Sequence, residues 1–248
     1  MTLSPVASSQ VISPSAPAQQ DTQVSPNVSS LQPFQVEQTT EFHPFHPGQQ
    51  VRPLSATEHG RVMTALHTSV NWLKKAIASL DQPSSWGTQA RTLLSSLFPG
   101  GLQQSSERNA LKAQLTHTLD GVQKQIDNDA STIGSATLER TVGESKRRIF
   151  PDHIGRPDEV HISNTWLRDG TDVDLAGTVM HEASHVYANT VDNWYNGKLT
   201  GSPPGFSHST ANVLSSVTDF TFTNAVNNAS TVQLAVEALA EVPFEAMH

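Results

Sequence analysis

The sequence predicts an α+β fold that is mainly helical and has a small sheet, and three observations lead to this prediction. Apolar residues recur at three- and four-residue steps through residues 55–128, which is the spacing of amphipathic helices. Short apolar runs at residues 148–150 and 160–163, separated by proline and glycine, are typical of strands. A further helical stripe covers residues 172–188. Helices and strands segregated along the chain in this way indicate an α+β domain.

The composition argues against several classes of function. The chain has 248 residues and a formal net charge of −8, so a nucleic-acid or anionic-membrane partner has no electrostatic support. No apolar run reaches the length of a membrane-spanning helix. The lack of cysteine removes disulfides, thiolate nucleophiles and cysteine-based zinc sites, and it favours a reducing compartment. Any metal ion must therefore be bound by histidine and carboxylate side chains.

The first fifty residues differ in composition from the rest of the chain. They are rich in serine, glutamine, proline and valine, and no lysine or arginine precedes Arg52. We expect residues 1–50 to be a disordered leader, because they lack the large apolar side chains whose burial offsets ordering entropy. This leader resembles the serine-rich, uncleaved signals of bacterial type III secreted effectors. The resemblance implies secretion into a host cell and a secretion chaperone as a partner, and a plain disordered tail is the alternative.

Residues 51–248 are expected to form one domain with two parts. The first part, residues 55–128, is helical, and the second part, residues 146–248, contains the residues with recognisable chemistry. Between them the apolar periodicity lapses, so residues 129–145 are expected to form a loop. We expect the helical part to bury its stripes in a common core, and a partner-binding surface is the alternative.

The helical part is expected to contain three helices. Ser55 and Glu58 have the spacing of a capping box, and the stripe that follows predicts a helix over residues 56–80. A shorter stripe over residues 86–97 stops at the Phe-Pro-Gly-Gly sequence that follows it. A third stripe covers residues 111–126. These helices carry no residues that point to chemistry.

The sequence HEASH, residues 181–185, has the clearest chemical signal in the chain. It lies in the helix expected over residues 172–188, where His181 and His185 are about 40° apart around the axis and one turn apart along it. Both imidazoles can therefore bind one metal ion. Glu182 lies beside this pair but is offset from it, which suits a base that acts on metal-bound water.

A catalytic zinc ion needs three protein ligands and one open position, so a third ligand is required. The metzincin pattern is excluded, because Ala188 and Val191 stand where it needs glycine and histidine. Asp192, seven residues past the second histidine, needs only a short turn to bring its carboxylate back over the pair. Glu237 and Glu241 in a later helix are the gluzincin-like alternative. The spacing alone leaves these options open.

Tyr195, three residues past Asp192, would place a phenol beside the same ion, where it can donate a hydrogen bond to an oxyanion. Together, these residues resemble the aspzincin (deuterolysin-like) zinc endopeptidases. Residues 176–185, AGTVMHEASH, match that family's active-site helix, and Thr190, Asp192 and Tyr195 match the segment after it. Residues 225–230 resemble the family's downstream helix.

The resemblance implies a zincin-like metallopeptidase domain with an HExxH active-site helix. It implies that His181, His185 and Asp192 bind Zn²⁺, that Glu182 is the catalytic base, and that Tyr195 is the transition-state donor. The expected activity is hydrolysis of a protein or peptide substrate through a Glu-activated, zinc-bound water. With the leader, this predicts a bacterial effector protease that acts on host protein.

Two departures from the family pattern limit what the resemblance implies. Ser230 and Gln233 stand where lysine-preferring members carry acidic residues, so a preference for lysine is not implied. The connection between the second histidine and Asp192 is also shorter than is usual in the family.

The alternative from another class is a non-catalytic interaction protein, in which residues 55–128 bind a partner and the HEASH helix holds a structural metal ion or none.

Overall fold

The structure is a computed structural model, and its account of the chain has gaps. It describes residues 42, 44–45, 48–138, 143–145, 158–192, 194–195, 198–199 and 221–243, and for residues 194, 195, 198 and 199 it describes the backbone alone. By internal contacts the chain divides into Met1–Gln38 and Thr39–His248, and every described residue belongs to the second unit. Most of the expected leader, and the expected strand at residues 148–150, lie outside the described residues.

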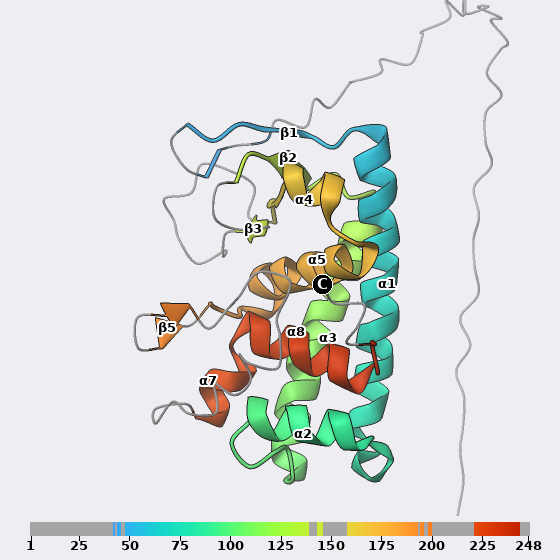
Figure 1. The fold of residues 1–248 in the computed structure, drawn as a ribbon, viewed down its shortest axis with the longest axis vertical. Helices are drawn as coiled ribbons and strands as arrows, with labels where there is room; N and C mark the ends of the chain where they lie inside the picture. Colours follow the sequence, from blue (N-terminus) through green and yellow to red (C-terminus); the bar gives the residue numbers. More distant parts are fainter. Residues whose placement is uncertain are drawn as a thin grey trace, which may run out of the picture. The chain divides into compact units, whose positions relative to one another are not determined.

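The described part of the chain is mainly helical with a small sheet, as the sequence predicts (Figure 1). Its helices are α1 (Ala56–Leu80), the short 3-10 helix η1 (Pro83–Ser85), α2 (Thr88–Leu97), α3 (Ser105–Asp127), α4 (Asn164–Asp169), α5 (Asp172–Ala188), α7 (Phe222–Val226) and α8 (Ala229–Leu239). Its strands are β1 (Val51–Pro53), β2 (Ile133–Ala136), β3 (Gly143–Ser145), β4 (Val160–Ser163), β5 (Trp194–Tyr195) and β6 (Lys198–Leu199). The expected helices over residues 56–80 and 172–188 are confirmed with the same bounds.

Both of these helices begin at a capping box. In α1, the Ser55 hydroxyl accepts a hydrogen bond from the Glu58 amide, and the Glu58 carboxylate accepts one from the Ser55 amide at 2.7 Å. In α5, Thr171 and Asp174 are paired in the same reciprocal way. These bonds satisfy amide groups that have no partner inside the helix, which explains why each helix begins where it does.

The expectation of a loop over residues 129–145 was wrong, because β2 and β3 lie there. The strand order of the sheet is β1-β2-β4-β3; β2 is parallel to β4 and antiparallel to β1, and β3 is antiparallel to β4. The sequence of β2, Ile133 to Ala136, has neither alternation nor β-branched residues beyond its first position. It is buried throughout and becomes a strand through pairing on both sides, which local pattern does not reveal.

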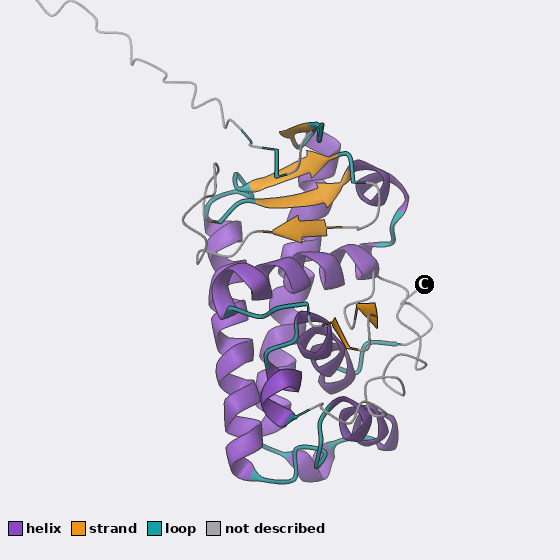
Figure 2. Cartoon of the chain, turned by 90° about the vertical axis from the view of Figure 1, so that its left-hand side faces the viewer, coloured by secondary structure: helices purple, strands orange, loops and turns teal. Residues whose placement is uncertain are grey.

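Helix α5 lies between the sheet and α8, and it also packs against α1 and α3 (Figures 1 and 2). Its stripe of Leu175, Val179 and Val186 is buried, as expected. Gly177 lets α8 approach closely, because a Cβ atom there would lie 2.6 Å from Gln233 Nε2. The helix that carries the two histidines is therefore held on several sides.

The apolar stripes of α1, α2 and α3 are buried in the common core, which confirms core packing as their role. Leu66, Leu73, Leu94 and Leu115 have no exposed surface. Among the described residues, no helix combines the length and the apolar character needed to cross a membrane.

Candidate metal centre

Three potential metal ligands, His181, His185 and Asp192, meet at one point, and we call this group the metal centre. The Nε2 atoms of His181 and His185 are 3.1 Å apart. Each also lies 3.4 Å from an oxygen of the Asp192 carboxylate. All three donor atoms lie within 4.8 Å of one another. The one-turn separation on α5 thus brings the two imidazoles together as the sequence predicts.

Asp192 reaches the histidines through a short turn that is fixed at both ends. The turn begins at Asn189, which ends α5 in the left-handed conformation with φ of 59°. It then runs beside the junction of α7 and α8. There the Val191 amide donates to the Asn227 carbonyl at 2.8 Å, and the Val191 carbonyl accepts from the Ala229 amide at 3.0 Å. These backbone bonds place Asp192 independently of its own side chain.

The turn also orients the second histidine. His185 Nδ1 lies 3.0 Å from the Thr190 carbonyl oxygen, which can only accept a hydrogen bond. Nδ1 therefore carries a proton, and Nε2 is the atom that faces the metal centre. The Thr190 hydroxyl lies 2.7 Å from the Ser184 hydroxyl, which donates to the His181 carbonyl at 2.7 Å. Thr190 is completely buried, so this small network is shielded from water.

Within the metal centre, the carboxylate and the imidazoles each favour the charged form of the other. Burial lowers the pKa of His185, but Asp192 and Glu182 raise it, and the net result is a pKa of about 9. Partial burial raises the pKa of Asp192, but the two imidazoles hold that pKa well below its usual range. The side chain of Asp192 is 35% exposed, so the centre is open to solvent on that side. A carboxylate here attracts positive charge to the point where the two imidazoles meet.

The chemistry of this donor set fits a zinc ion. Two imidazole nitrogens and one carboxylate oxygen are ligands that zinc prefers, and three protein ligands leave a fourth position for water or substrate. The chain contains no cysteine, so a thiolate ligand is excluded from the whole sequence. His181, His185 and Asp192 are thus the residues that would hold the ion.

Glu182 lies beside the metal centre and is almost completely buried, at 5% exposure. Among the described residues its Oε2 atom has no hydrogen-bond partner. Burial raises the pKa of Glu182 above its ordinary value, and the neighbouring histidines act in the opposite direction. An acidic group with a raised pKa beside a metal-ligand set is suited to accept and return a proton near neutral pH.

Strand β3 covers Glu182, which the sequence gives no means to predict. A Cβ atom at Gly143 would lie 2.9 Å from Glu182 Oε1, so only glycine allows this close approach without a shift. The Ser145 hydroxyl donates to the Glu182 carbonyl at 3.3 Å. Both residues lie about forty positions before Glu182 in a segment that we expected to be a loop, so no local pattern connects them to it.

The backbone of Tyr195 lies in β5, three residues past Asp192. Its side chain is outside the part of the chain that the structure describes, so the expected role as an oxyanion donor stays a prediction. β5 pairs with β6 in a separate two-stranded sheet.

The two glutamates of the gluzincin-like alternative are engaged elsewhere. Glu237 is buried and accepts a hydrogen bond from Gln233 at 2.9 Å. Glu241 makes an ion pair with Lys75 at 2.9 Å. Neither belongs to the group of converging donors, whereas Asp192 does. The geometry therefore favours the aspartate as the third ligand.

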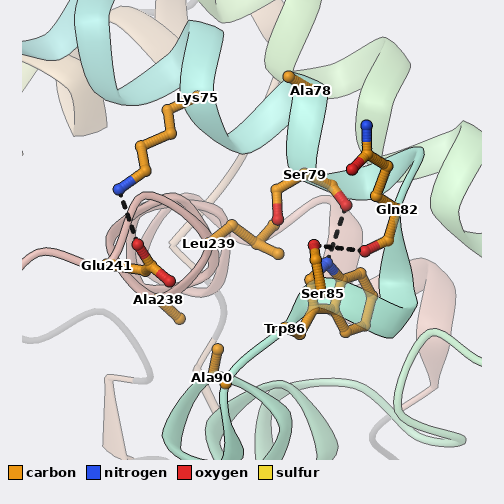
Figure 3. Close-up of a pocket in the computed structure, with 11 residues that line it drawn as sticks. Lys75, Ala78, Ser79, Gln82, Ser85, Trp86, Ala90, Ala238, Leu239 and Glu241 are labelled. Atoms are coloured by element: carbon orange, nitrogen blue, oxygen red, sulfur yellow. Dashed lines mark hydrogen bonds and ion pairs between the residues drawn. The ribbon is translucent and has the colours of Figure 1, made fainter.

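A cavity of about 290 Å³ lies between the C-terminal ends of α1 and α8, next to η1 (Figure 3). The ion pair of Lys75 and Glu241 lies at one side of it. At the other side, Trp86 Nε1 donates to the Ser79 carbonyl at 2.8 Å. The residues that line it do not include the ligands of the metal centre. This cavity is therefore distinct from the site built by α5.

No known protein-family model matches the chain, and no curated protein matches it either. Among solved structures, the chain is similar to a zinc peptidase from Grifola frondosa, with a TM-score of 0.45 and 21% sequence identity. That similarity covers 74% of this chain and 96% of the other.

Proposed function

We propose that this chain is a zinc-dependent endopeptidase whose ion is bound by His181, His185 and Asp192 and whose catalytic base is Glu182. The observation that carries the proposal is the convergence of three donor atoms within 4.8 Å beside a buried carboxyl group. A solvated helix face with incidental histidines is incompatible with α5, because His185 and Glu182 are both buried. The non-catalytic alternative, in which residues 55–128 bind a partner and α5 holds a structural metal ion or none, predicts no peptide hydrolysis by the zinc-loaded chain.

The roles of the residues follow from their positions. A bound zinc ion supplies Lewis-acid activation of water and of a carbonyl oxygen. Glu182 accepts the proton of the attacking water and returns it to the leaving amine nitrogen, and its raised pKa brings both steps closer to neutral pH. Thr190 holds His185 in the orientation that binds the ion. Tyr195 is proposed, from the family resemblance, as the donor to the developing oxyanion.

The position of β3 supports an extended peptide as the substrate. Among the described strands β3 is at the edge of the sheet, and it lies directly over Glu182. An extended chain can add to the edge of a sheet through backbone hydrogen bonds, which are independent of the substrate's side chains. A peptide bound in this way would run past the catalytic carboxyl group.

The proposal that this peptidase is a translocated effector rests on the composition of residues 1–50. These residues are mostly outside the described part of the chain. Its test is separate from the test of catalysis: fusion of residues 1–50 to a reporter protein should direct the reporter through a type III secretion system, and a failure to do so would contradict it.

The experiment that tests the proposed activity is hydrolysis of unfolded, dye-labelled casein by the full chain loaded with zinc. We expect cleavage that stops on chelation and returns with added zinc. The Glu182→Gln variant keeps the shape of the side chain but has no base, so it should lose about 1,000-fold in rate while it still binds zinc. Equal rates for the variant and the original chain would contradict the role of Glu182.

A further inference from the structure

A second histidine with two carboxylate partners lies outside the metal centre, and we call Glu144, His161 and Glu159 the His161 cluster. His161 Nδ1 lies 2.9 Å from Glu144 Oε1, and Nε2 lies 2.8 Å from Glu159 Oε1. The side chains of His161 and Glu159 are buried, and that of Glu144 is 14% exposed. Gln49 also donates a hydrogen bond to Glu144.

The geometry of the His161 cluster indicates an imidazole ring that carries both protons. With both glutamates ionised, a neutral imidazole would donate from one nitrogen only, and its second nitrogen would face the lone pairs of a carboxylate at hydrogen-bond distance. With both nitrogens protonated, each carboxylate accepts a charge-assisted hydrogen bond. Burial lowers the pKa of His161, but the two glutamates together raise that pKa by more than burial lowers it. The pKa of His161 is therefore above its ordinary value.

Aromatic side chains from the segment before β1 cover this ring. Phe45 stacks on His161 with a centroid distance of 3.8 Å, and Phe42 contacts it edge-on at 6.3 Å. Stacking on a cationic ring is favourable, and it also keeps water away from the two hydrogen bonds. The residues that we expected to be the end of a leader thus contribute to the fold at this place.

The His161 cluster is connected to Glu182, which lies beside the metal centre, through the three residues of β3. Glu144 is bonded to His161, and its two neighbours in the strand, Gly143 and Ser145, both contact Glu182. β3 has only three residues and pairs with β4 alone within the described sheet. Such a short strand has few backbone hydrogen bonds to hold it, so the side-chain bond of Glu144 adds to the attachment that β3 gains from β4 and from its packing on α5.

We propose that His161 is a positioning residue, which as a buried cation holds β3 through Glu144 and thereby keeps Gly143 and Ser145 against the catalytic base Glu182. The ring touches neither the metal ligands nor the base, and it acts through the strand. The effect on turnover rests on the proposed function, whereas the effect on the position of β3 does not.

A second metal site is a poorer explanation of the same residues. The two carboxylates lie at opposite nitrogens of one ring, so their oxygens and the ring nitrogens do not converge on one point. The ring is also stacked against Phe45 and fully buried. The cluster therefore satisfies a buried charge instead of presenting ligands to an ion.

The test compares two variants, each of which replaces one of the two carboxylates bonded to the His161 ring with an amide. Glu144→Gln weakens the bond to β3, and Glu159→Gln weakens the matching bond to a residue outside β3. Both should be measured as the full chain loaded with zinc, by amide hydrogen exchange at Gly143–Ser145, with the amides of α1 and α3 as the reference for global unfolding. We expect exchange in β3 to be about tenfold faster in Glu144→Gln than in Glu159→Gln.

Three further measurements complete the test. The zinc content should be equal in both variants, and casein hydrolysis should fall about tenfold in Glu144→Gln alone. In the original chain, nitrogen-15 NMR of the His161 ring should show both nitrogens protonated at neutral pH. Equal exchange of β3 in the two variants, or a neutral ring, would overturn the proposal. If the original chain itself fails to cleave casein, the proposed function fails, and the exchange data still decide the role of His161.

Discussion

The metal centre and the His161 cluster are built from the same chemical groups but have opposite geometry. In the metal centre, two imidazoles and a carboxylate direct their donor atoms at one point, and the carboxylate is 35% exposed. In the His161 cluster, two carboxylates lie at opposite sides of one fully buried ring. One arrangement can accept an ion from solvent, and the other already contains its own cation.

Residue type alone therefore does not define a metal site. Histidine and acidic residues are ligands in one place and a buried ion pair in the other, and convergence and access to solvent separate the two. The two groups also differ in what supports them. Backbone hydrogen bonds fix Asp192 at the α7–α8 junction, whereas the His161 cluster itself fixes the strand that carries Glu144.

The largest expected effect comes from the removal of one carboxylate from each group. Asp192→Ala should lower zinc affinity about 1,000-fold or more, because loss of residues that only orient metal ligands already costs 10–100-fold. Glu159→Ala, which removes a carboxylate from the His161 cluster, should leave zinc affinity within about threefold and instead lower the stability of the fold. Competition titration with a zinc chelator measures both affinities. Equal losses of affinity would erase the distinction between the two groups.

Glu237 is a buried acid that is bonded to Gln233 instead of a histidine, and its ionisation affects the stability of the fold. Burial raises the pKa of Glu237 from 4.5 to about 7; the hydrogen bond from Gln233 opposes this and the charge of Asp174 adds to it. Between pH 4.5 and about pH 7, Glu237 therefore holds a proton in the folded chain that it releases in the unfolded chain. The stability that this proton contributes is complete below pH 4.5 and is lost as the pH rises to about 7.

Glu237→Gln removes this titration, so its stability should depend less on pH. Between pH 5 and pH 8 the original chain should lose roughly 2–3 kcal/mol more than the variant does. Urea unfolding of both chains at the two pH values measures the difference. Parallel pH profiles would show that Glu237 remains charged when buried. The variant should also keep its zinc, since Glu237 is not among the converging donors.

A smaller effect is expected at the contact between β3, which carries Glu144 of the His161 cluster, and Glu182, which lies beside the metal centre. In Gly143→Ala the added methyl group would lie 2.9 Å from Glu182 Oε1, so the strand or the base must shift. We expect casein hydrolysis to fall about tenfold with zinc content unchanged. Gly60→Ala is the matched control, because a Cβ atom at Gly60 in α1 meets nothing within 4 Å. A rate in Gly143→Ala equal to that in Gly60→Ala would mean that β3 does not constrain the base.

The sequence was sufficient to predict the parts of the site that depend on local geometry. The bounds of α5 follow from its apolar stripe and from Thr171, and the meeting of His181 with His185 follows from the helical repeat. Asp192 also lies where a short turn after Asn189 would bring it. In each of these cases the interacting residues are within about one helical turn or one tight turn of each other.

The remaining parts depend on contacts between distant segments, which no local pattern records. β2 has small residues without alternation, and it is a strand because it pairs with β1 and β4. The bond between Glu144 and His161 requires the register of β3 against β4. The close approach of Gly143 to Glu182 requires the position of that sheet on α5. Tertiary packing decides all three, and a single sequence does not reveal it.

The zinc content of the purified full chain, measured by elemental analysis beside that of His185→Ala and His161→Gln, shows which of the two histidine groups binds the ion. We expect one zinc ion per chain in the original protein and in His161→Gln, and none in His185→Ala. The absence of zinc from the original chain after reconstitution, or its loss from His161→Gln with retention in His185→Ala, would contradict the assignment of the metal centre.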